Sequence, residues 1–120
     1  MKKTILALMV LLSLGQAKER ILNTYSLTVE ADATKANGKA WDVNGGAPDI
    51  LIKVDGVFLN FDKKCKNSYG CTVEFTVEQE TSWYFEIYDK DFTSNDLIAK
   101  GNCSVGKECS FSGAKITIGQ

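Results

Sequence analysis

Residues 83–98 read WYFEIYDKDFTSNDLI. Bulky apolar residues at positions 83, 85 and 87 alternate with more polar ones, and this period of two predicts a half-buried strand. The strand leads directly into Asp89, Asp91 and Asp96. Carboxylates crowded on one loop suit Ca²⁺, because this ion takes about six to eight oxygen ligands. The stretch therefore predicts a calcium site, and the alternative is a polar loop whose acids extend into water.

The first 17 residues have the pattern of a bacterial-type secretory signal. Two lysines precede a short apolar run, Ile5–Leu12, and small or polar residues follow up to Ala17. A membrane anchor is the alternative, but about ten apolar residues are too few to span a bilayer. We expect residues 1–17 to be removed and the chain to be exported, either to the periplasm or out of the cell. No later stretch is apolar enough to be a transmembrane segment.

Composition argues against two classes of function. Without Lys2 and Lys3 the chain carries 12 basic and 15 acidic residues, a net charge of about −3, whereas nucleic acid requires a basic face. The chain has no histidine, the side chain that most often performs acid–base chemistry at neutral pH. Two carboxylates can hydrolyse a glycoside or serve a metal hydrolase, but no second catalytic group is evident. We therefore expect that the protein is not an enzyme.

Four cysteines are spaced Cys65-x5-Cys71 and Cys103-x5-Cys109. In an exported chain an even number of cysteines indicates disulfides, and four cysteines allow three pairings. Two local bridges are the simplest, because the partners of each are close in sequence. A four-cysteine zinc site is the alternative, but its ligand pairs are normally separated by two to four residues rather than five.

Short alternating segments with frequent turn signals predict an all-β sandwich, with residues 18–25 as a short lead-in and residues 26–120 as the domain. Expected strands begin at Leu27, Ile50, Val57, Val73, Trp83, Leu97 and Ile116. Asp55-Gly56 predicts a tight hairpin turn. The residues expected to face the core are Leu27, Val29, Ile50, Ile52, Val54, Val57, Leu59, Phe61, Val73, Phe75, Val77, Trp83, Phe85, Ile87, Ile116 and Ile118.

Antiparallel strands alternate in direction, so three connections should meet at one end of such a sandwich: residues 34–49, 62–71 and 89–96. Asp42 and Asp49 would then lie beside Asp89, Asp91 and Asp96. Five carboxylates in one place repel one another strongly unless a cation is present. This convergence favours calcium over a solvated loop.

With these features, roughly Leu27 to Gly101 resembles a C2 domain. In that family an acidic first loop leads into an Asp-Pro-Tyr-Val-Lys-Val-like strand, and here residues 42–54 read DVNGGAPDILIKV. The family's third calcium loop follows a Val-x-Asp-x-Asp strand end, and here residues 87–98 read IYDKDFTSNDLI. The first loop is longer than in the family, the third is one residue shorter, and Asp49 is followed by Ile50 instead of Pro. An EF-hand loop matches poorly. Counted from Asp89 as position 1, it needs Gly at position 6 and Glu at position 12, where this chain has Ser94 and Lys100.

The resemblance implies an eight-stranded antiparallel C2-like β-sandwich that binds Ca²⁺ at one end. Carried over by position, the ligands would be Asp42, Asp49, Asp89, Asp91 and Asp96.

Filled sites in this family often dock on phospholipid. Trp41, Val43 and Phe92 would lie at loop tips, where aromatic groups can enter a membrane interface. Lys63 and Lys64 could meet anionic headgroups. The alternative is that Trp41 and Phe92 pack back onto the sandwich while the lysines balance the aspartates.

The function expected from these residues is Ca²⁺-dependent binding to phospholipid or another partner through the end loops. The alternative is a module stabilised by calcium and disulfides that binds a protein partner without a lipid step.

Overall fold

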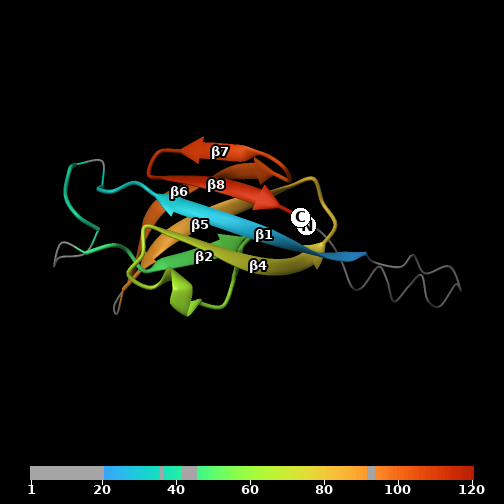
Figure 1. Cartoon of the computed structure of the whole chain (residues 1–120), viewed down its shortest axis with the longest axis horizontal. Coiled ribbons are helices and arrows are strands. Elements are labelled where there is room, and N and C mark those ends of the chain that lie inside the picture. The colour runs from blue at the N-terminus through green and yellow to red at the C-terminus, as the bar shows by residue number, and fades with distance from the viewer. Residues whose placement is uncertain (1–20, 36, 42–45, 92–93) are drawn as a thin grey trace, which may run out of the picture.

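The computed structural model describes residues 21–35, 37–41, 46–91 and 94–120, which form a β-sandwich (Figure 1). Sheet A has the strand order β4-β1-β8-β7 and sheet B the order β3-β2-β5-β6, and all paired strands are antiparallel. The strands are β1 (Leu22–Ala31), β2 (Ile50–Val54), β3 (Val57–Phe58), β4 (Gly70–Glu78), β5 (Ser82–Lys90), β6 (Asn95–Ser104), β7 (Glu108–Phe111) and β8 (Ala114–Gly119). A single 3₁₀ turn, η1 (Lys63–Cys65), precedes β4. Among the described residues, no helix has the length and apolar character needed to cross a membrane.

Strand β1 begins earlier than the sequence pattern predicted. It starts at Leu22, within the segment expected to be a lead-in, and it places Tyr25 in the core at 1% exposure. The Tyr25 ring contacts Trp83 at 4.7 Å and Phe75 at 5.6 Å between ring centroids. Because Tyr25 and Phe75 belong to sheet A and Trp83 to sheet B, this aromatic cluster holds the two sheets together.

The predicted core is present with one clear exception. Val57 was expected to face inward, but it is 66% exposed. Strand β3 has only two residues and lies at the edge of sheet B, so no strand of sheet A covers Val57. Beyond Phe58, Leu59 N–H makes one more hydrogen bond to the Ile52 carbonyl of β2, and Leu59 and Phe61 pack against the core only in part. The short strand β7 begins inside what was predicted to be a cysteine-closed loop, at Glu108, and ends at Phe111.

The two local disulfides, Cys65–Cys71 and Cys103–Cys109, are confirmed. Their Cα atoms are 5.2 and 5.8 Å apart. The first bridge joins η1 to the start of β4. The second joins β6 of sheet B to β7 of sheet A, so it links the two sheets along one side of the sandwich.

The same side is closed by glycines where backbone and side chains come very close. A Cβ atom at Gly101 on β6 would lie 2.2 Å from the Phe111 ring of β7. A Cβ atom at Gly113, in the turn between β7 and β8, would lie 2.1 Å from the Ile98 carbonyl oxygen. Gly113 also has a φ of +106°, which side chains rarely adopt. Only glycine therefore lets the β7–β8 hairpin lie directly on β6.

We expect Gly113→Ala to lower the free energy of unfolding by about 2 to 4 kcal/mol, because the added methyl overlaps a backbone carbonyl and the backbone is strained. Gly119→Ala is the matched control: no atom lies within 4 Å of its Cβ position, and a change of less than about 0.5 kcal/mol is expected. Urea unfolding followed by tryptophan fluorescence measures both. Equal midpoints for the two variants would contradict the close approach.

Candidate metal site at the loop end

Three connections meet at one end of the sandwich, as the strand directions predicted. They are the described parts of the connection after β1 (residues 32–35, 37–41 and 46–49), residues 59–69 before β4, and the described ends of the turn between β5 and β6, toward the left of Figure 1. Backbone hydrogen bonds join them: Ser68 N–H donates to the Pro48 carbonyl at 2.9 Å, and Lys90 N–H donates to the Asp49 carbonyl at 2.8 Å. The turn itself is closed by Asp91 N–H donating to the Ser94 carbonyl at 3.0 Å.

Asp89, Asp91 and Asp96 form a cluster at this end, here called the acidic triad. Each offers a carboxylate oxygen, and the three oxygens lie within 4.8 Å of one another. Asp89 and Asp96 are strand residues rather than loop residues, because β5 runs to Lys90 and β6 begins at Asn95. The triad is therefore held by a hydrogen-bonded hairpin.

A β-bulge at Ile98 brings Asp96 beside Asp89. Ile87 pairs with Ala99, but the next pairs are Tyr88 with Leu97 and Asp89 with Asp96, so Ile98 is the extra residue. Directly opposite residues in an antiparallel pair share a face of the sheet. In an unbroken register Asp96 would lie opposite Lys90 and face the other way. The bulge thus turns Asp96 onto the same face as Asp89.

Asp89 differs from its two partners in burial. It is 0% exposed, whereas Asp91 and Asp96 are exposed. Its Oδ1 accepts a hydrogen bond from Asp49 N–H at 3.0 Å. A buried carboxylate is costly unless it is hydrogen-bonded or paired, and neighbouring negative charges add to this cost. A cation bound among the three carboxylates would relieve it.

Asp49 was predicted to be a first-loop metal ligand, but it does not belong to the acidic triad. Its carboxylate Oδ1 accepts a hydrogen bond from Asn67 N–H at 2.6 Å, so it is used to tie residues 59–69 to residues 32–49. Together with the bond from Asp49 N–H to Asp89, this links the triad to both neighbouring connections. Asp49 is therefore placed as a bridge between loops.

The remaining predicted site residues are placed in three ways. Asp42, Val43 and Phe92 lie outside the described residues. Trp41 is 8% exposed, is part of the core, and donates its indole N–H to the Asp32 carbonyl at 2.7 Å. It thus packs back onto the sandwich instead of projecting from a loop tip. Lys63 and Lys64 are exposed in η1, with the Lys64 ammonium 3.9 Å from Asp62.

A small pocket of about 240 Å³ adjoins the triad at Asp96. Asp32, Lys35 and Trp41 line it from the first connection, and Leu97 lines it from β6. The sequence pattern marked the first connection for its aspartates at 42 and 49, so it missed Asp32 and Lys35. The turn signals in residues 34–48 were a hint that this segment folds back over the strand ends.

A second polar cluster lies on the outer face of sheet B. The Tyr88 hydroxyl donates to the Glu86 carboxylate, and this hydrogen bond, with smaller effects from burial and the charge of Glu86, raises the pKa of Tyr88. Lys53 lies 3.9 Å from Glu86 and 4.9 Å from the centre of the Phe58 ring. Since neighbouring strand residues point to opposite faces, Tyr88 faces away from the triad residue Asp89.

No protein-family model matches the chain, and a search of curated proteins finds no significant match. The resemblance to C2 domains therefore depends on the two acidic segments and the strands before them.

We expect Asp49→Ala to lower the free energy of unfolding by about 1 to 2 kcal/mol, because Asn67 N–H loses its acceptor. Asp49→Asn keeps a side-chain oxygen and should lose less than about half of that. Chemical unfolding in EDTA gives both values. If Asp49→Asn kept stability in EDTA but lost the response to Ca²⁺, Asp49 would be a metal ligand and its place outside the triad would be wrong.

Proposed function

We propose that the protein binds Ca²⁺ through Asp89, Asp91 and Asp96 and that the ion stabilises the loop end of the sandwich. The observation that carries the proposal is the convergence of three carboxylate oxygens within 4.8 Å, one of them on a fully buried residue. Carboxylate oxygens are hard ligands, which suit Ca²⁺ and Mg²⁺ better than softer metals. A C2-like architecture, with acidic segments at one end, is part of the same proposal.

Ca²⁺ fits the triad better than Mg²⁺. Two of the three residues are exposed, so water can complete a coordination shell of irregular geometry. Ca²⁺ accepts such variable shells, whereas Mg²⁺ demands a near-ideal octahedron and gives up its own water reluctantly.

The effect of the ion would spread through Asp89. The carboxylate of this residue accepts from Asp49 N–H, and the Asp49 carboxylate accepts from Asn67 N–H. Fixing Asp89 therefore also fixes residues 46–49 and 66–69. A bound ion would act as a structural crosslink between three connections, and its binding energy would add to the stability of the fold by linkage.

For the unaltered protein we expect Ca²⁺ at about 100 times its Kd to raise the free energy of unfolding by about 2.7 kcal/mol, with a smaller effect of Mg²⁺.

Asp96→Asn should differ from the parent in stability in opposite directions without and with Ca²⁺. In EDTA it should be at least as stable as the parent, because one of three repelling charges is gone. In Ca²⁺ it should show little or no gain. Thermal unfolding in EDTA, MgCl₂ and CaCl₂ measures all of these.

Glu74→Gln is the control for loss of charge alone, because Glu74 is an exposed strand residue outside the triad. It should retain the full Ca²⁺ response. An identical midpoint for the parent in EDTA and in Ca²⁺ would refute the metal site, and an equal loss of response in Glu74→Gln would show that the effect is general screening.

A phospholipid surface is the second candidate partner of the loaded end. The exposure of Lys63 and Lys64 favours it, because basic side chains near an anionic surface each contribute up to about 1 kcal/mol. The inward packing of Trp41 removes one of the groups expected to enter the interface. The structural role of calcium does not depend on this step.

If the loaded end docks on lipid, the protein should sediment with phosphatidylserine vesicles in Ca²⁺ but not in EDTA. Lys63→Ala combined with Lys64→Ala should then reduce the bound fraction several-fold, while the Ca²⁺ effect on thermal unfolding is unchanged. Equal sedimentation with and without Ca²⁺ would leave calcium with its structural role alone.

Export is also part of the proposal. The chain has two disulfides, and such bonds form and persist mainly in oxidising compartments, such as the periplasm or the medium. They support the secretory signal expected from residues 1–17, which lie outside the described residues. We further propose that the exported protein acts by binding, without catalysis.

A further inference from the structure

The sandwich has four sheet edges, and three of them are protected. Strand β3 is only two residues long, which leaves little to pair with. The edges formed by β6 and β7 lie together under the Cys103–Cys109 disulfide, and β6 also carries the bulge at Ile98. The fourth edge, β4, is nine residues long, without proline, lysine or a bulge. No described strand pairs with its outer side.

The register shows which backbone groups β4 presents at that edge. Ala31 N–H donates to the Tyr69 carbonyl and Gln79 N–H donates to the Ile21 carbonyl, so odd-numbered residues of β4 bond to β1. The even-numbered residues therefore direct N–H and C=O outward. At Gly70 both groups bond to the Ser68 hydroxyl. Further along β4, Glu74 and Thr76 line a groove, and Thr72 precedes them on the strand.

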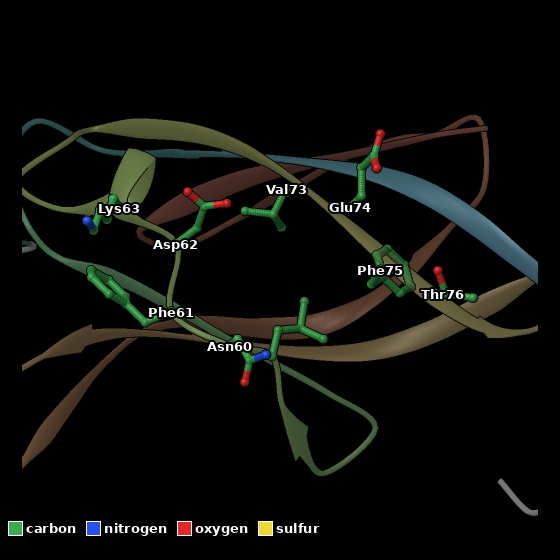
Figure 2. A pocket seen from close by; sticks show the side chains of 9 residues that line it. Asn60, Phe61, Asp62, Lys63, Val73, Glu74, Phe75 and Thr76 are labelled. Atoms are coloured by element: carbon green, nitrogen blue, oxygen red, sulfur yellow. The ribbon is translucent and has the colours of Figure 1, made fainter.

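The groove has a volume of about 600 Å³ and lies between β4 and the extended segment 59–63. Figure 2 shows Asn60, Phe61 and Asp62 on one side and Val73 and Phe75 on the other. Its floor is apolar, because Val73 and Phe75 belong to the core and Leu59 and Phe61 pack against it. A strand hydrogen-bonded to β4 would lie along this groove.

The charges along β4 and the groove indicate which kind of peptide strand could pair with this edge. On the outer face, Thr72 and Thr76 bond to Thr28 and Thr24 of β1 through their hydroxyls. Glu74 lies between them and makes no ion pair with any other described residue. On the opposite wall the Asp62 carboxylate is already 3.9 Å from the Lys64 ammonium, and Lys63 lies at the η1 end, which leaves Glu74 as the acidic group that an added strand would meet. The outward side chains of an added strand would meet Glu74 directly, where a basic residue is favourable.

We propose that the β4 edge is a docking site for an extended peptide segment of another protein, in which apolar residues alternate with lysine or arginine. The peptide adds a fifth strand to sheet A beside Thr72, Glu74 and Thr76. Its apolar side chains enter the groove over Val73 and Phe75, and its basic side chains face Glu74. The site does not involve the acidic triad, so binding is independent of calcium.

A peptide fits this edge better than a second copy of the chain. Segment 59–63 forms the other wall of the groove, and a second copy paired with β4 would bring a segment 59–63 of its own to the same edge. Pairing β4 with its equivalent would also bring two acidic edges together, each with Glu74 near its centre. A short basic strand meets neither obstacle.

The test uses a peptide of about six residues, the usual length of a strand, in which valine alternates with lysine. Binding to the disulfide-bonded protein is measured by calorimetry in EDTA and in Ca²⁺. Thr76→Pro removes one outward N–H that β1 does not use, and should weaken binding at least about tenfold. Thr76→Ala keeps that N–H and should bind within about twofold of the parent. Glu74→Lys should weaken the lysine peptide and favour a matched peptide with glutamate.

Amide hydrogen exchange on the unaltered protein tests the same site directly, and misfolding of a variant cannot affect the result. The peptide should slow exchange at the N–H groups of Thr72, Glu74 and Thr76. Unchanged exchange there, or equal binding by Thr76→Pro and Thr76→Ala, would overturn strand addition. A dimer in sedimentation that Thr76→Pro disrupts and the peptide does not would assign the edge to a second copy and overturn the peptide. Loss of binding in EDTA alone would overturn independence from calcium.

Discussion

The pairing of β5 with β6, and the one-residue bulge within it, is the constraint on which the loop end depends. The bulge at Ile98 lets Ile98 and its neighbour Ala99 both be buried, and it moves Leu97 to the exposed face. It also sets Asp96 opposite Asp89. The Ile98 carbonyl is in turn the group that Gly113 must approach. One register shift thus fixes both the acidic triad and the packing of the β7–β8 hairpin on β6.

The two sides of the sandwich are built differently. Along β6 and β7, a disulfide, close-packed glycines and an aromatic ring join the sheets directly. Along β4 a groove separates the strand from segment 59–63, and the Cys65–Cys71 bridge holds the chain after this segment to the start of β4. The chain just before β4 has no strand pairing, so the disulfide supplies the link there. A disulfide stabilises a fold by restricting the unfolded chain, and this effect does not need local hydrogen bonds. The bridge keeps the groove's outer wall in place without filling it.

Alternation along the strands predicted most of the core, because side chains on a strand must alternate between faces. The all-β class, the Asp55-Gly56 turn and the local disulfides were predicted for similarly local reasons. Tyr25 was missed because polar neighbours made its segment resemble a lead-in. Val57 was wrongly placed inside, since alternation cannot show that a strand stops after two residues. The bulge was also invisible: it depends on how Ile98, Ala99 and Gly113 pack, which are contacts between strands.

The candidate site was predicted in outline for a topological reason and differed in detail for a hydrogen-bonding reason. Strand direction places the connections after β1, before β4 and after β5 at one end of the sandwich, and the pairing of β2 with β5 then brings Asp49 beside Asp89. Strand direction does not determine which groups a carboxylate at this end contacts. The Asp49 carboxylate accepts a hydrogen bond from Asn67 N–H at 2.6 Å, which ties this side chain to the neighbouring connection. Asp49 therefore holds the backbone around the triad through two hydrogen bonds, contacts that strand direction alone does not predict.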